Sequence, residues 1–200
     1  MNPFKLNQAK IERFQMENLF LTMRKLKLDE LGRVGIEDFK KQEKLPVIVI
    51  LDNVRSMHNI GSIFRTSDGF AVEKIYLCGI TAQPPHREIE KTALGATQSI
   101  EWVYYENVTD AIKDLKGLKY KIIAIEQAEN SVMLTNYKPD LSEKYALIFG
   151  NEVQGVSDEA MSMIDTCIEI PQFGTKHSFN IVVSAGIVLW DFFSKLNLKL

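Results

Sequence analysis

The chain has 200 residues, enough for one medium-sized domain with a short extension. Its hydrophobic fraction of 46% and charged fraction of 25% are ordinary for a globular protein, and a net charge of −2 disfavours nonspecific nucleic-acid binding over the whole surface. No apolar run is long enough to span a membrane, and Met1–Gln15 lacks a signal-peptide core. We therefore expect a cytoplasmic protein.

The N-terminal part is mildly basic. Residues 1–44 carry ten Lys or Arg against seven Asp or Glu, whereas the rest carries 14 against 19. This indicates either RNA contact or a solvated amphipathic helix. Helical spacing runs from Asn7 to about Leu28, and a second short helix is expected over Ile36–Gln42. We divide the chain into a helical extension, residues 1–44, and a main domain, residues 45–200.

From Pro46 onward, short β-branched runs alternate with helical patterns. Strands are expected over 47–51, 74–78, 100–105, 121–125, 146–149 and 167–170. Helices are expected over 59–69, 88–94 and 109–115, in a short segment from Ser157, and over 179–196. This alternation predicts an α/β fold with a mainly parallel sheet.

Polar clusters follow several of these strands. They are Asp52–Asn59, Glu126–Gln127, Gly150–Glu152 and Pro171–Asn180. Ligands of open parallel sheets bind beyond the carboxyl ends of the strands, so these loops are expected to converge on one site.

The candidate residues also have purely structural interpretations. Asn59 and Ser178 each suit the cap of a helix. Arg65, which keeps its proton at neutral pH, suits phosphate recognition or an ordinary surface position. Gly150 either lets backbone approach a ligand or makes a strand-to-helix turn. His177 has no paired acid in the sequence and is interpreted as incidental.

Other site types lack support. No dinucleotide fingerprint, phosphate-binding P-loop or serine nucleophile elbow is present. The three histidines have no metal-ligand spacing, so we expect no metal. Cys78 and Cys167 lie in apolar runs and predict buried thiols rather than a disulfide.

Three segments have a distinctive order and spacing. They read N-x-G-x-x-x-R at 59–65, G-N-E-x-x-G at 150–155 and I-P-x-x-G-x-x-x-S-F-N at 170–180. Together they resemble the signature of the SpoU/TrmH family of RNA 2′-O-methyltransferases, over about residues 46–193. The visible departure is Phe179, where the family commonly has leucine, and it affects only the detail of the cofactor pocket.

The resemblance implies a SPOUT fold, with helices on both faces of the sheet and a C-terminal deep trefoil knot, a rare exception to the usual chain topologies. It also implies a pocket for S-adenosylmethionine, formed by Glu126, Gln127, Gly150, Ile170 and Phe179. Members are typically homodimers. The apolar face of the last helix, with Ile187, Leu189 and Trp190, suits that contact or simple core packing equally well.

The implied reaction is methyl transfer to a ribose 2′-hydroxyl of RNA. The residues implied to carry it are Arg65, Asn59, Glu152, Ser178 and Asn180. Arg65 would help to draw off the hydroxyl proton together with a substrate phosphate, or would position the ribose. Asn59 would orient the phosphate or Arg65, and Glu152 would steer Arg65 or a ribose hydroxyl. Ser178 and Asn180 would hold the loop and the substrate.

The extension is too short for a separate RNA-binding domain, which favours tRNA as the substrate, with 23S rRNA as the alternative. Basic residues of the extension are then expected to contact phosphates, namely Lys25, Lys27, Lys40 and Lys41. A noncatalytic RNA-binding module and a structural oligomer subunit are the alternatives from other classes.

Overall fold

The computed structural model describes residues 24–196 and falls into two units, which divide between Val34 and Gly35. In the first unit, η1 (Leu28–Leu31) ends at Gly32, whose φ of 58° is left-handed. The helix expected over Asn7–Leu28 lies largely outside the described residues, and residues 24–27 are not helical. The second unit begins before α2 (Ile36–Lys41), which the sequence analysis assigned to the N-terminal extension. The domain boundary between residues 44 and 45 stays a prediction.

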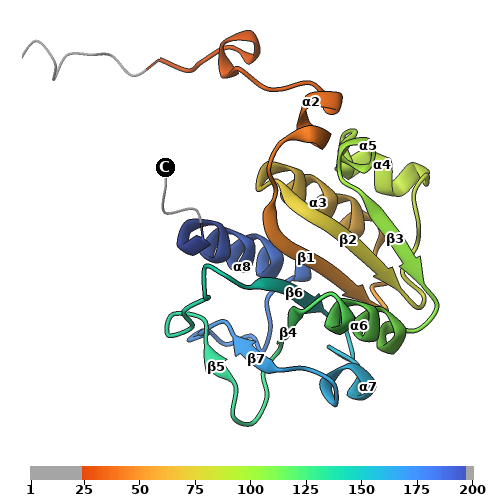
Figure 1. Ribbon diagram of the computed structural model, residues 1–200, viewed down its shortest axis with the longest axis vertical. Helices are drawn as coiled ribbons and strands as arrows, with labels where there is room; N and C mark the ends of the chain where they lie inside the picture. Colours follow the sequence, from red (N-terminus) through yellow and green to blue (C-terminus); the bar gives the residue numbers. More distant parts are fainter. Residues whose placement is uncertain (1–23, 197–200) are drawn as a thin grey trace, which may run out of the picture. The chain divides into compact units, whose positions relative to one another are not determined.

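A seven-stranded sheet forms the centre of the second unit (Figure 1). Its strands are β1 (Leu45–Asp52), β2 (Val72–Cys78), β3 (Trp102–Tyr105), β4 (Tyr120–Ile125), β5 (Val132–Met133), β6 (Lys144–Phe149) and β7 (Thr166–Glu169). They are arranged in the order β3-β2-β1-β6-β4-β7-β5, and all pairings between them are parallel. Six of the strands were expected from the sequence, and β5 was not.

Seven α-helices are described in this unit. After α2 come α3 (Met57–Gly69), α4 (Arg87–Ala93), α5 (Ala96–Ser99), α6 (Val108–Gly117), α7 (Asp158–Met161) and α8 (Ile181–Leu196). Side-chain caps fix where several helices begin: Ser56 is the N-cap of α3, and Ser157 is the N-cap of α7. The short helix predicted from Ser157 is therefore confirmed.

Both faces of the sheet are covered by helices. Successive side chains of a strand point to opposite faces, so Val47, Val49 and Leu51 pack into the core beneath α3 and α8. Ile48 and Ile50 pack into a second core beneath α6 and α7. Burial on both faces explains why β1 reads as a continuous apolar run. The predicted α/β class is confirmed, and the trefoil knot stays a prediction.

Four neighbouring strands, β1, β6, β4 and β7, deliver their loops to one edge of this sheet. Because the strands are parallel, the polar clusters that follow them meet there, as the sequence predicts. Elsewhere, Cys78 and Cys167 are buried free thiols, and burial raises the pKa of Cys78 to about 12. No helix within residues 24–196 is long and apolar enough to cross a membrane.

Candidate active site

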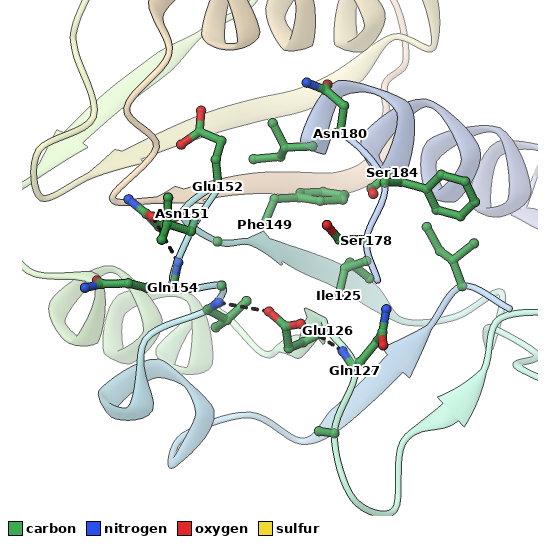
Figure 2. Close-up of a pocket in the computed structure, with 18 of the residues that line it drawn as sticks. Ile125, Glu126, Gln127, Phe149, Asn151, Glu152, Gln154, Ser178, Asn180 and Ser184 are labelled. Atoms are coloured by element: carbon green, nitrogen blue, oxygen red, sulfur yellow. Dashed lines mark hydrogen bonds between the residues drawn. The ribbon is translucent and has the colours of Figure 1, made fainter. Parts of the chain in front are cut away.

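A cavity of about 680 Å³ lies at this edge of the sheet (Figure 2). Most of the predicted site residues line it: Glu126, Gln127, Gly150, Glu152, Ile170, Ser178, Phe179 and Asn180. In the view of Figure 2, Phe149 and Ser178 lie between the Glu126–Gln127 turn and the side chains of Glu152 and Asn180. A volume of this size suits a small-molecule ligand.

Glu126 braces two segments of the cavity wall. Its carboxylate accepts hydrogen bonds from the backbone N–H of Val156 at 3.1 Å and of Gln127 at 2.9 Å. Gly155 lies against it with a φ of 73°, and a Cβ at that position would come within 2.3 Å of the Glu126 carboxylate. The left-handed backbone conformation favours glycine at position 155, and a larger residue would also displace the Glu126 carboxylate.

Residues 150–155 form a tight loop after β6. Backbone hydrogen bonds of 2.8 and 2.9 Å join Asn151 to Gly155 in both directions. A Cβ on Gly150 would lie 2.1 Å from the backbone of Gly155 and Val156, so no larger residue fits there. Gly150 is needed for this close contact and not for a left-handed φ, and it also lines the cavity.

Asn151 has a structural function that the sequence interpretation missed. The residue is only 9% exposed, and its side chain donates to the carbonyl of Asn53 at 2.7 Å. Its Oδ1 accepts from the N–H groups of Val153 and Gln154. It ties the loop after β6 to the loop after β1. The position of Asn151 at the centre of the second motif was the sequence signal that could have indicated this function.

Glu152 holds the start of α3. Its carboxylate accepts from the backbone N–H of Arg55 and of Ser56, both at 3.0 Å, and from the Asn59 amide at 2.9 Å. Partial burial raises the pKa of Glu152, but these hydrogen bonds stabilise the ionised form and outweigh it, so the pKa lies below its ordinary value. Among residues 24–196, Glu152 pairs with Asn59 and not with Arg65.

Asn59 connects all three motifs. It lies in the first turn of α3 and is not the cap, because Ser56 accepts the hydrogen bond from the Asn59 N–H. Its Oδ1 lies 3.5 Å from the Asn180 amide nitrogen, at the upper limit for a hydrogen bond. Asn180, rather than Ser178, caps α8, since its Oδ1 accepts from the N–H of Val182 at 2.8 Å.

Arg65 lies apart from this cavity. It is exposed and lines a second hollow of about 540 Å³ together with Ser62, Thr66, Lys91 and Thr92. At 1.5 Å per helical residue, six residues place its Cα about 9 Å along α3 from that of Asn59. Within the described chain its guanidinium makes no hydrogen bond or ion pair.

The loop between β7 and α8 forms the most exposed wall of the cavity. Phe173 is 99% exposed, and all residues from Phe173 to Asn180 are exposed. The Gln127 side chain donates to the His177 carbonyl at 2.7 Å and so links this loop to the β4 turn. The contact uses the His177 backbone, and the interpretation of its side chain as incidental stays a prediction.

Residues 46–190 match the model of the SpoU rRNA Methylase family. The chain belongs to this SpoU family. It is 34% identical over 181 residues to the tRNA (guanosine(18)-2′-O)-methyltransferase of Aquifex aeolicus, covering 88% of this chain and 78% of that protein.

A second relative is named for a different RNA. The chain is 29% identical over 159 residues to the 23S rRNA (guanosine-2′-O-)-methyltransferase RlmB of Neisseria meningitidis serogroup B, covering 79% of this chain. It spans 62% of the length of that protein, and 62% of a Staphylococcus saprophyticus relative with which it shares 33% identity.

Solved structures agree with this membership. The crystal structure of the A. aeolicus TrmH/SpoU tRNA modifying enzyme superposes with a TM-score of 0.72 at 26% identity, over 82% of this chain and 83% of that one. An AdoMet-bound rRNA methyltransferase from Sinorhizobium meliloti superposes with a TM-score of 0.69 at 27% identity, over 77% and 59%. The mainly parallel α/β fold implied by the resemblance to this family is confirmed, and the knot stays a prediction.

Proposed function

We propose that this protein transfers a methyl group from S-adenosylmethionine to a ribose 2′-hydroxyl of RNA. The observation that carries the proposal is the meeting of three motifs at Asn59, which contacts Glu152 of the second motif and Asn180 of the third. A chance match of short patterns would not bring them together beside one cavity. The relatives named for 2′-O-methylation of tRNA and rRNA support the same reaction.

The cavity fits S-adenosylmethionine by size and by chemistry. Its wall offers backbone at Gly150, a polar side chain at Gln127, the Glu126 carboxylate, and apolar surface at Ile170 and Phe179. These five residues would hold the cofactor, in line with the AdoMet-bound relative from S. meliloti. When bound, S-adenosylmethionine supplies an electrophilic methyl group on a sulfonium sulfur. No metal is needed for such a donor.

The residues of this chain have to align and activate the ribose. A hydroxyl is a weak nucleophile until its proton is drawn off, and a guanidinium cannot take that proton unaided. Arg65 therefore orients the ribose, or acts together with a substrate phosphate. Asn59 is a positioning residue whose amide is fixed by Glu152. Asn180 and Ser178 hold the entrance to α8 beside the bound substrate.

We favour tRNA as the substrate. The tRNA relative is the more similar of the two and is matched over more of its length. The runner-up is 23S rRNA, supported by the Neisseria relative. Either RNA goes with the cytoplasmic location expected from the sequence.

The test is methyl transfer from labelled S-adenosylmethionine to separate pools of unmodified tRNA and rRNA, followed by nucleoside analysis. We expect a 2′-O-methylated nucleoside from tRNA, whereas label in rRNA alone would favour the runner-up. Arg65→Ala should abolish transfer while calorimetric titration with S-adenosylhomocysteine stays unchanged. If Arg65→Ala transferred the methyl group at the full rate, the assignment of Arg65 to catalysis would be wrong. If the unmodified chain did not bind S-adenosylhomocysteine, the proposed function would be contradicted.

We also propose that the protein is a homodimer that pairs through α8. Leu189 is fully buried and packs into the core, so it does not belong to the exposed face of α8. In the single chain, α8 leaves Val183 48% exposed and Trp190 59% exposed, and burying such apolar surface would stabilise a dimer. Sedimentation equilibrium should give twice the chain mass, and Trp190→Ser should shift the equilibrium towards the monomer. A monomer at all concentrations would exclude the dimer.

A further inference from the structure

The second hollow, between α3 and α4, has a distinct chemical character. Its five lining residues are two cations and three hydroxyl-bearing residues, contributed by consecutive turns of the two helices: Ser62, Arg65, Thr66, Lys91 and Thr92. No carboxylate is among them. The two cations in this lining suit an anion with several oxygen atoms.

Close packing of the two helices fixes its shape. A Cβ on Gly61 would lie 2.2 Å from both the Ile89 carbonyl oxygen and the Thr92 hydroxyl, so the helices touch at this glycine. The hydroxyls of Ser62 and Thr92 both donate to the carbonyl of His58, at 2.8 and 3.0 Å. The walls of the hollow are therefore held by contacts that exist without any ligand.

These contacts also decide which groups remain for a ligand. Ser62 and Thr92 donate their hydroxyl protons to the His58 carbonyl, and Thr66 donates its own to the Ser62 carbonyl at 3.0 Å. The hydroxyls thus have no proton left over for an anion. The charge of the ligand has to be met by the two remaining groups, the guanidinium of Arg65 and the ammonium of Lys91.

Lys91 is held beside the hollow by an ion pair with Glu88. Its Nζ lies 2.7 Å from Glu88 Oε1, and Glu88 Oε2 lies 2.9 Å from His58 Nε2. An ammonium group has three N–H donors, and the Glu88 contact occupies one. Lys91 is thereby oriented and can still donate to a second acceptor. With one carboxylate against two cations, the local charge stays positive.

Asn59 of α3 contacts Glu152 and Asn180, which both line the main cavity. Ser62 lines the hollow, and three helical residues separate it from Asn59 by about 4.5 Å along the axis of α3. A nucleotide whose ribose lies beside Asn59 therefore has its neighbouring backbone within reach of Arg65 and Lys91.

We infer that this hollow binds a backbone phosphate next to the ribose that is methylated, with Arg65 and Lys91 as its ligands. The inference rests on the proposed function and adds Lys91, which lies in none of the three motifs, to the residues that recognise RNA. A phosphate held there would also lie beside Arg65, where a proton acceptor is needed to assist it.

The test compares Lys91→Met with Lys113→Met. Both lysines are exposed on a helix and form an i,i+3 ion pair, at 2.7 Å with Glu88 and at 2.9 Å with Asp110, but Lys113 lies on α6. Affinity for the RNA that is methylated is measured over a series of salt concentrations, and S-adenosylhomocysteine is titrated separately. Lys91→Met should weaken RNA binding severalfold and lower the slope of log K against log salt by about 1, because one phosphate contact is lost.

Lys113→Met should match the unmodified chain, and Lys91→Arg should keep most of the affinity because it keeps the charge. All variants should bind S-adenosylhomocysteine equally. If Lys91→Met had the affinity and salt slope of the unmodified chain, the inference would be overturned. If the unmodified chain bound RNA without methylating it, the proposed function would fail while the comparison still tested the phosphate site. If the unmodified chain bound no RNA, both the inference and the proposed function would be contradicted.

Discussion

The two walls of the main cavity differ in how they are held. The loop at residues 150–156 is fixed by the Glu126 carboxylate, by the buried Asn151 side chain and by a close contact between backbone segments at Gly150. The wall between β7 and α8 is exposed. Within the described chain, residues 172–179 make one hydrogen bond to the rest of the protein, from Gln127 to His177. The fold itself shapes the first wall, whereas the second has few contacts that constrain it.

Among the substitutions in the two walls, Gly150→Ala should have the largest effect on stability. The new methyl group would meet backbone atoms at 2.1 Å, and backbone cannot rotate away as a side chain can. We expect a loss of about 3 kcal/mol in the free energy of unfolding. In a chain of this size that corresponds to a fall of roughly 6 to 12 °C in Tm. Thermal unfolding measures it, and a Tm within a degree of the unmodified chain would show that the first wall is not rigid.

Glu152→Gln should have an intermediate effect. The amide keeps one acceptor oxygen but turns an N–H₂ group towards N–H donors, so at least one of the three hydrogen bonds is lost. For this exposed residue we expect a cost of about 1 kcal/mol at neutral pH. Chemical denaturation of both chains at a series of pH values measures it.

The pH dependence of that difference has a definite sign. The pKa of Glu152 is lower in the folded chain than its ordinary value of 4.5, so the unfolded chain takes up the proton first. The stabilisation from Glu152 is therefore fully present above pH 4.5 and is lost as the pH falls through the lower, folded pKa. The gap between the two chains should close in that acidic range, and a gap that widened there would contradict the assignment.

Gly174→Ala should have the smallest effect and is the matched control for Gly150→Ala. A Cβ at Gly174 would meet no atom within 4 Å, and the residue has no left-handed φ. We expect a change in the free energy of unfolding between zero and a gain of about 0.5 kcal/mol, from reduced freedom of the unfolded chain. A clear loss of stability would show that the exposed wall is more constrained than its contacts indicate.

The sheet and its main helices could be predicted from the sequence because their signals are local. The apolar run of β1 and the periodic apolar positions of α3 and α6 report burial directly. Two short elements of the second unit were not predicted: β5 has two residues at the edge of the sheet, and α5 has four. Neither is long enough to establish a period.

The lining of the cavity could be predicted in part, since the polar loops after parallel strands meet at one edge. The pairings within it could not. Asn59 and Glu152 are 93 residues apart, and no linear pattern specifies that Glu152 contacts Asn59 instead of Arg65. The sequence left both Asn59 and Ser178 open as helix caps. The structure gives these positions to Ser56 and Asn180, because the helices begin two residues away from the expected starts.

Gly61 carries a consequence for the range of anions that the protein can accept. Its missing side chain lets α3 approach α4 until the Cα of Gly61 faces the Ile89 carbonyl directly. Any larger residue would push the helices apart and increase the distance between Arg65 and Lys91. A position that contacts no ligand therefore sets the distance between two positive charges, and with it the diameter of the anion that fits between them.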